Sequence, residues 1–298
     1  MRIPTQSVSD GITRQLAQLS SRQAKLQNQV ATGQRIFQPE DDPAAVGRVL
    51  TIQSERSQVQ QFARNADHAL QISQASFAGL QAVKRISDRA GELATLGEGA
   101  ISPESFHAYS TEIDQLLEQG LQQANTKLGN DFIFAGTAAD ASPFTATRNS
   151  SGKITALTYN GTASSAPIQI SETSTLTPGT GGATNQNLAD FLNRLVSLRD
   201  ALQAGSTTAV AAVRSPLDDS ENKLIEVMGE TGAVQTRIEV AKDQLISRFH
   251  DSEKLISNET DADLPETIVK LTQTQTAYQA ALQSASSIMK LSLLDYLR

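Results

Sequence analysis

Three neighbouring acids, Glu40, Asp41 and Asp42, form the densest group of side chains that could hold a divalent cation. Carboxylate oxygens suit such an ion, but three adjacent residues cannot all face one ion, and the sequence places no further ligand beside them. Asp42 also precedes Pro43, a pairing typical of a helix start, with the acid as N-cap and its charge at the positive end of the helix. We therefore expect a turn and a cap here, and no metal site.

Other reactive residue types lack the partners that chemistry needs. The histidines His68, His107 and His250 stand alone, with no second ligand at metal spacing. Ser151-Gly152-Lys153 is similar to the end of a phosphate-binding loop, but Ile154 stands where that loop requires Ser or Thr. The chain has no cysteine, which excludes disulfides and a thiolate nucleophile. The sequence predicts no catalytic, cofactor-binding or metal-binding residue, and hence a protein that is not an enzyme.

Composition narrows the class further. The chain has 298 residues, of which 39% are hydrophobic and 4% aromatic, and it has no Trp, so a thick compact core is not expected. The formal net charge of −7 argues against a nucleic-acid surface. No segment approaches the roughly 18 apolar residues of a membrane span. The first residues contain no apolar core of a cleaved signal peptide, which leaves a cytosolic protein or one exported by another route.

Both ends of the chain carry apolar residues at alternating steps of three and four. This spacing of about 3.5 residues keeps one stripe of a helix facing a partner helix. We predict an antiparallel pair formed by these two segments, which becomes fully ordered only against neighbouring subunits. The predicted assembly residues are Ile12, Leu16, Leu19, Leu26, Val30, Ile268, Leu271, Tyr278, Leu282, Ala285, Met289 and Leu293.

Helix signals and a change of composition predict five regions. Gly33 is placed to close the first helix, Asp42-Pro43 and Ser215-Pro216 to open later ones, and Pro265 to open the last. The middle of the chain is rich in Thr, Ser and Gly, with two strand-like runs separated by a turn at Asn149–Gly152. A candidate third strand follows at 168–170 and an irregular loop at 176–187. The expected fold is mainly α: an elongated antiparallel helical bundle or coiled coil built from both chain ends, with a small β-rich insert. The regions are an N-terminal arm and connector (1–42), a first rod half (43–135), the insert (136–187), a second rod half (188–262) and a C-terminal arm (263–298).

The chain contains the motifs Met1–Gln6, Ala31–Ile36, Gln38–Ala45, Gly129–Thr137 and Leu291–Leu297. Together these motifs resemble the flagellin family of bacterial flagellar proteins, and within it the proteins of the hook–filament junction. The resemblance covers both helical ends of the chain and is weak in the insert. Pro39 and Pro43 around the acids, the Phe-Ile-Phe-Ala-Gly run and the Asp-Tyr-Leu ending favour a junction protein over flagellin itself.

The resemblance implies a structural role without catalysis or cofactors. It implies contacts with hook-associated protein 1, with flagellin and with further copies of the chain, and an export chaperone before secretion. It also implies an extracellular place in the flagellum, reached by type III export without a cleaved signal peptide. Two alternatives stay open at this point: flagellin, the filament subunit, and an unrelated coiled-coil binding protein.

Overall fold

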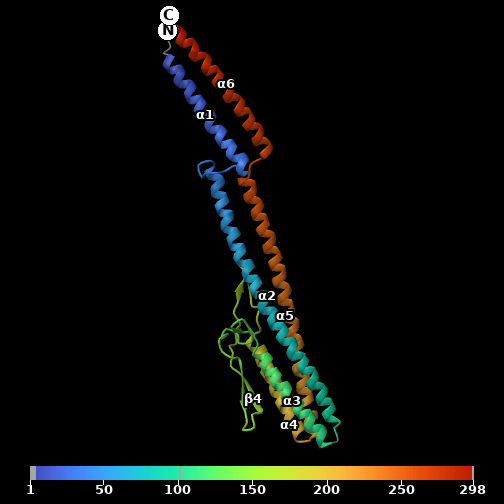
Figure 1. The fold of residues 1–298 in the computed structure, drawn as a ribbon. Helices are drawn as coiled ribbons and strands as arrows, with labels where there is room; N and C mark the ends of the chain where they lie inside the picture. The colour runs from blue at the N-terminus through green and yellow to red at the C-terminus, as the bar shows by residue number, and fades with distance from the viewer. Residues whose placement is uncertain (1–4, 101, 297–298) are drawn as a thin grey trace. The chain divides into compact units, whose positions relative to one another are not determined.

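The computed structural model describes residues 5–100 and 102–296, and the side chains of residues 10–100 and 102–287. Helices dominate these residues, and short antiparallel strand pairs lie between the third and fourth helix, so the predicted mainly α fold with a small β insert is confirmed (Figure 1). The helices are α1 (Thr5–Thr32), α2 (Pro43–Glu98), α3 (Pro103–Ala124), α4 (Gly182–Gln203), α5 (Thr207–Thr260) and α6 (Leu264–Tyr296). The strands are β1 (Lys127–Leu128), β2 (Asp131–Phe132), β3 (Phe144–Arg148), β4 (Ile154–Tyr159), β5 (Ile168–Gln169) and β6 (Thr175–Leu176).

The chain divides into two compact units. The first unit contains Met1–Ser57 and Arg248–Arg298, and the second contains Gln58–Ser247. The border between them therefore falls inside α2 and α5, whereas the sequence placed the arm boundaries at residues 42 and 263. The first unit holds the α1–α6 pair, and the second holds the main hydrophobic core.

The core of the second unit lies between parts of α2, α3, α4 and α5, with the β3–β4 hairpin packed on α4. Phe144, Ile154 and Leu157 of the hairpin are buried in it. The side-chain amide of Asn193 on α4 accepts from the Leu157 N–H and donates to the Leu157 carbonyl oxygen, both at 2.8 Å. The helix thus provides β4 with the paired hydrogen bonds that a further strand would give.

The turn of this hairpin is where the sequence placed it. The Asn149 N–H donates to the Lys153 carbonyl oxygen, and the Asn149 carboxamide accepts from Ser151. Gly152 has φ of 80°, a conformation that glycine adopts without strain. The strand expected at 168–170 forms, but it pairs with β6 rather than with the hairpin. The reason is a tight turn: the Ile170 N–H donates to the Ser174 carbonyl oxygen, which folds this segment back on itself.

Two helix starts differ from the prediction. α5 begins at Thr207, and Pro216 lies inside it rather than at its start. The buried side chains Val210 and Leu217 hold this stretch against the core, and packing outweighs the lost backbone hydrogen bond. α4 begins at Gly182, inside the segment expected to be a loop. A Cβ atom at Gly182 would lie 2.4 Å from the Ala163 Cα, so this glycine serves close packing.

Three serine hydroxyls of α2 are buried without a hydrogen-bond partner: Ser73, Ser76 and Ser87. An unpaired buried hydroxyl costs about 1–3 kcal/mol. Replacing any of the three with Ala is therefore expected to raise the free energy of unfolding by about 1 kcal/mol, measured by thermal or urea unfolding. Ser110→Ala is the matched control, because this equally buried hydroxyl donates to the His107 carbonyl oxygen at 2.9 Å. If Ser110→Ala stabilised the protein as much, helix propensity would explain the gain instead.

Candidate assembly site

The apolar stripe of α1 faces α6. The two helices lie side by side and antiparallel, and we call them together the arm (Figure 1). Leu26 is 7% exposed, and the other predicted α1 residues are partly buried. These partly buried residues are Ile12, Leu16, Leu19 and Val30. The α1 residues that the 3-4 spacing marks thus lie on the covered side of the helix.

The covered face of α6 is rotated from its predicted stripe. Leu271 and Tyr278 are partly buried and Ala285 is buried, but Ile268 is 46% and Leu282 is 45% exposed. In the single chain Leu282 is therefore exposed rather than buried against α1. Met289 and Leu293 lie outside the described side chains.

Threonines occupy the places that the apolar residues were expected to take. Thr267 and Thr274 are buried, and their hydroxyls donate within the helix to the carbonyl oxygens of Asp263 and Lys270, both at 2.7 Å. Because these hydroxyls are satisfied, they can be buried at little cost. The covered face is centred about 45° from the predicted stripe, taking about 100° per residue.

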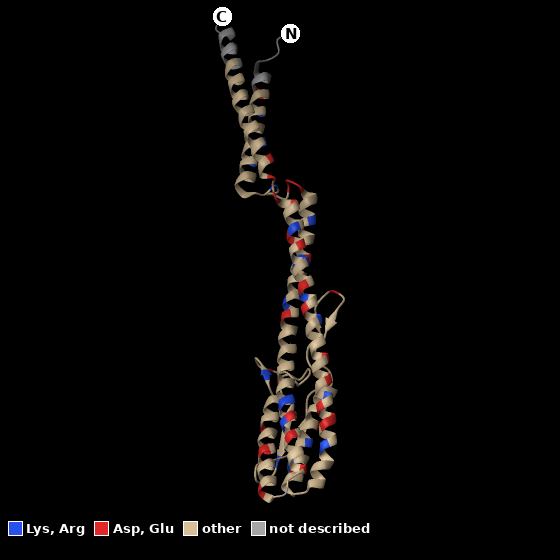
Figure 2. Cartoon of the chain, turned by 90° about the vertical axis from the view of Figure 1, so that its right-hand side faces the viewer, with Lys and Arg blue, Asp and Glu red and all other residues tan. Residues whose placement is uncertain are grey.

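The arm carries few charges. α6 has no charged side chain from Leu271 to Met289, and α1 has four charged residues in its length, Asp10, Arg14, Arg22 and Lys25. Figure 2 shows the contrast with the long helices α2 and α5, which carry groups of blue and red residues separated by tan stretches. A helix pair that stayed in water would ordinarily present charges on its outer faces. The composition of the arm is therefore typical of a surface that is covered by other protein.

A connector of residues 33–42 joins α1 to α2. Gly33, with φ of 71°, ends α1, and its N–H donates to the Gln29 carbonyl oxygen at 2.9 Å. Asp42 Oδ1 accepts the Ala45 N–H at 3.0 Å, and α2 begins at Pro43. The acid Asp42 therefore caps the start of α2, as the sequence predicted.

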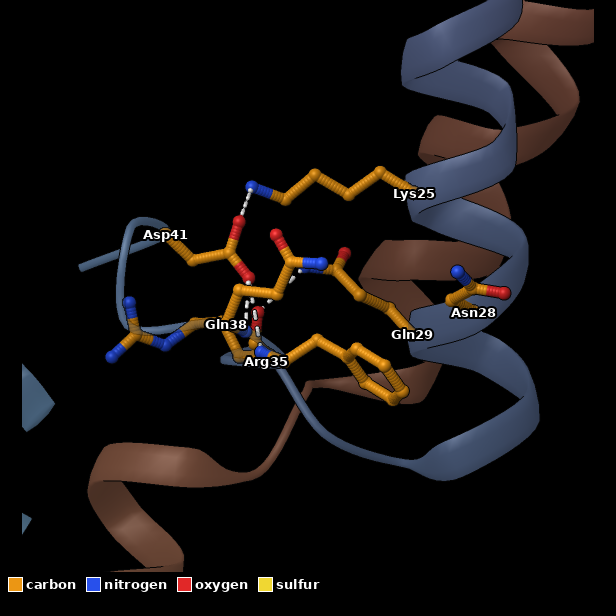
Figure 3. Close-up of a pocket in the computed structure, with 7 residues that line it drawn as sticks. Lys25, Asn28, Gln29, Arg35, Gln38 and Asp41 are labelled. Atoms are coloured by element: carbon orange, nitrogen blue, oxygen red, sulfur yellow. Dashed lines mark hydrogen bonds and ion pairs between the residues drawn. The ribbon is translucent and has the colours of Figure 1, made fainter.

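Asp41 holds the tip of the connector (Figure 3). Its Oδ2 accepts the N–H groups of Phe37 and Gln38, both at 3.0 Å, and its Oδ1 lies 2.6 Å from Lys25 Nζ on α1. A shallow recess surrounds these contacts, lined by Lys25, Asn28, Gln29, Arg35, Phe37, Gln38 and Asp41. The dashed lines in Figure 3 join residues that line this recess to one another. Within the described part of the chain, no group of His, Asp or Glu side chains is arranged to hold a metal ion.

A second set of charges ties the connector to α5 and α2. Arg48 of α2 forms a bidentate ion pair with Glu259 of α5, with 2.9 Å between Nε and Oε1 and 2.8 Å between Nη2 and Oε2. Arg35 lies 3.3 Å from Asp42 Oδ2 and donates to the Glu259 carbonyl oxygen at 2.8 Å. The Arg35 N–H also donates to the Thr260 carbonyl oxygen at 2.6 Å. Apart from Arg35 and Asp42, these partners are more than two hundred residues apart in the sequence, and no local motif pointed to them.

Acid is expected to loosen the connector. The hydrogen bond from Lys25, together with the N–H groups of Phe37 and Gln38, holds the pKa of Asp41 far below its ordinary value of 3.8. A carboxylate with a lowered pKa stabilises the fold above its ordinary pKa, and this contribution is lost as pH falls from about 4 through the lowered value. Protease cleavage at residues 33–42 should therefore accelerate as the pH falls below about 4.

Asp41→Asn should already give faster cleavage at neutral pH, several-fold over the wild type, because the amide cannot replace a carboxylate that accepts from three donors. The rate is measured by limited proteolysis with mass spectrometry. Glu40→Gln, at the adjacent exposed acid, is the matched control and should leave the rate unchanged. Equal rates in the wild type and Asp41→Asn at neutral pH would show that Asp41 does not hold the connector.

Comparison with known proteins points to one family. Residues 3–139 match the family model described as bacterial flagellin N-terminal helical region. The chain is 24% identical to flagellar hook-associated protein 3 of Escherichia coli strain K12, with 98% of both chains covered. Among solved structures, Bacillus cereus FlgL matches with a TM-score of 0.60 and 21% identity, covering 70% of this chain and 99% of that one. The flagellar junction protein FlgL from Legionella pneumophila matches with a TM-score of 0.52 and 13% identity, covering 72% and 100%.

These findings define the class first: residues 3–139 of the chain are similar to the N-terminal helical region of bacterial flagellins. Within this class the chain resembles one particular protein, hook-associated protein 3, because the similarity to it spans almost the whole of both chains. The resemblance to that protein, which the sequence motifs carried, is confirmed. The solved structures, at their low identity, add the fold. In the described residues, none of the helices combines the length and apolarity that a membrane span requires.

Proposed function

We propose that the chain is a structural component of the bacterial flagellum that forms the junction between hook-associated protein 1 and the flagellin filament. The observation that carries this proposal is the similarity to hook-associated protein 3 along nearly its entire length, including both arm helices. The arm gives it a physical basis. Its apolar stripe is incompletely covered in the single chain, and its surface is poor in charge.

Assembly needs no chemical catalysis. Covering the arm releases about 25 cal/mol for each Å² of apolar surface removed from water, and ordering the helices opposes this gain. Among the described side chains of the arm, four are buried: Leu26, Thr267, Thr274 and Ala285. Helices with so few buried contacts are marginal in water. The free chain therefore stays unassembled, and neighbouring subunits supply the missing contacts.

The partners of the chain follow from its proposed place at the junction. Hook-associated protein 1 lies on one side, flagellin on the other, and further copies of the chain complete the layer. The chain reaches the outside of the cell unfolded through the flagellar type III route, without a cleaved signal peptide and after binding an export chaperone. The absence of cysteine suits this route, since no disulfide can fix a fold before exit.

Removing the gene tests the proposal against flagellin. Loss of a junction protein leaves hooks intact while flagellin is shed as soluble subunits, and loss of flagellin leaves no flagellin to shed. Electron microscopy of the hooks and an immunoblot of the medium distinguish these results. Intact filaments on cells without the gene would refute the junction role.

Cell fractionation tests the remaining alternative, an unrelated coiled-coil binding protein. A junction protein is found with flagella sheared from the cells. A chain found in the cytosol alone would favour the alternative and count against the proposal.

A further inference from the structure

A cavity in the second unit lies between α2 and the segment that joins α3 to α4, which we call the β segment (residues 125–181). Its volume is about 520 Å³, within the range of about 300–1,000 Å³ that is usual for small-molecule pockets. The wall is mostly apolar, as in such pockets, and its titratable side chains are His68 and Asp131. The large apolar side chains of the wall are Ile72, Leu128, Phe132, Ile133, Ile168 and Pro178.

Two contacts hold the β segment on α2, one on each side of this cavity along the helix. At the first, the Asn65 side chain donates to the Gln169 carbonyl oxygen at 2.8 Å. At the second, the Phe134 ring packs on Gly79, where a Cβ atom would lie 2.9 Å from the ring. At 1.5 Å per residue these contacts are about 21 Å apart along α2, and Ile72 of the wall lies between them. The two walls are fixed on either side, so the cavity is formed before any ligand binds.

Asp131 gives the cavity a negative charge that nothing neutralises. Within the described part of the chain, its carboxylate has no hydrogen-bond or ion-pair partner. The neighbouring cation Lys127 is not part of the wall, because its ammonium lies 4.3 Å from the centroid of the Phe132 ring. Leu128 is directly opposite Asp131 in the β1–β2 pair, so an apolar side chain and a charge share one face there. The cavity therefore attracts a cationic group and repels an anionic one.

We propose that this cavity binds a small organic cation, made of an aromatic or branched apolar body with a protonated amine. The apolar body lies against Ile72, Leu128 and Ile168, and the amine pairs with Asp131. His68 adds an imidazole that can form a hydrogen bond with a polar substituent. The net charge of −7 further favours a cation over an anion. This site goes beyond the assembly function, since it lies in the second unit and the arm belongs to the first.

Binding of naphthylmethylamine to the purified full-length chain tests the site. Naphthylmethanol is the matched probe, because it has the same aromatic body and no charge. The chain has no Trp, so the fluorescence anisotropy of either probe can be followed without indole emission. The expected result is saturable binding of one probe per chain. The amine should bind about three- to fivefold more tightly than the alcohol, in the upper part of the range for an exposed ion pair.

Two pairs of variants separate the charge of the cavity from its space. Asp131→Asn should abolish the preference for the amine, whereas Asp140→Asn, at an exposed acid outside the wall, should retain it. Ala166→Trp, at an exposed residue of the wall, fills the cavity and should weaken binding of both probes by about tenfold. Ala141→Trp, at an exposed alanine outside the wall, is its control and should bind as the wild type does.

Methyl NMR of the isoleucine-labelled wild type locates the probe without any substitution. The signals of Ile72 and Ile168 should shift when the amine is added, and the signal of Ile113, buried in the core outside the wall, should not. Absence of saturable binding to the wild type, or shifts that spare Ile72 and Ile168, would overturn the proposal. Binding by Ala166→Trp as tight as that of the wild type, or a preference for the amine that survives Asp131→Asn, would overturn it as well.

Discussion

Leu26→Asp is expected to leave the protein exported but unable to retain a filament. Leu26 is buried in the contact of α1 with α6, and a carboxylate there costs several kcal/mol because burial removes its hydration. The arm would separate, and the surface that it presents to neighbouring subunits would be lost. Motility and the amount of flagellin shed into the medium measure the effect.

Ala24→Asp is the control for that change, since Ala24 is exposed on the other side of α1. It adds the same charge two residues away and should retain filaments as the wild type does. Wild-type motility of Leu26→Asp would contradict the role of the arm. Equal loss in both variants would attribute the effect to added charge rather than to a broken stripe.

Arg199→Met is expected to destabilise the second unit by about 3 kcal/mol, near the lower end of the range for breaking a buried ion pair. The Arg199 side chain is 4% exposed and lies 3.1 Å from Asp114 and 2.7 Å from Asp200. It also donates to the Ile154 carbonyl oxygen at 2.5 Å, which ties β4 to α4. Burial opposes the charge of Arg199, but hydrogen bonds with Asp200 and Asp114 outweigh it and raise its pKa.

Arg148→Met gives the comparison for this second prediction. Arg148 pairs with Glu118 at the surface, with 2.7 Å between Nη2 and Oε2, and exposed pairs contribute up to about 1 kcal/mol. Urea unfolding of the two variants should therefore differ by about 2 kcal/mol. Lys153 stays 2.8 Å from Asp114 and limits the loss in Arg199→Met. Equal losses in the two variants would mean that burial of Arg199 does not matter.

The sequence predicted features that depend on neighbouring residues. The 3-4 spacing from Ile12 to Val30 predicted the side of α1 that is covered, and Asn149–Gly152 predicted the hairpin turn. Gly33 and Asp42-Pro43 lie at the helix ends where local rules placed them. The helix ends and the turn are closed by contacts within a few residues, and the periodicity of α1 marks the side that packs even though its partner α6 lies at the other end of the chain.

Features that depend on tertiary packing could not be predicted. Threonines were not expected on the covered face of α6, because their hydroxyls look polar until the hydrogen bonds within the helix are known. Pro216 and Gly182 read as a helix start and a loop, since the contacts that place them inside or at the start of helices come from distant residues. The pairing of Arg48 with Glu259 has no local signature at all.

Hydrogen exchange compared between the free chain and isolated flagella tests the central claim, that other subunits complete the arm. In the free chain, amides of α1 and α6 should exchange far faster than those of Leu188–Leu202, which lie in the core of the second unit. In flagella, the amides of the arm should become as slow as those of the core. Arm amides already as protected as the core in the free, dilute chain would contradict the account.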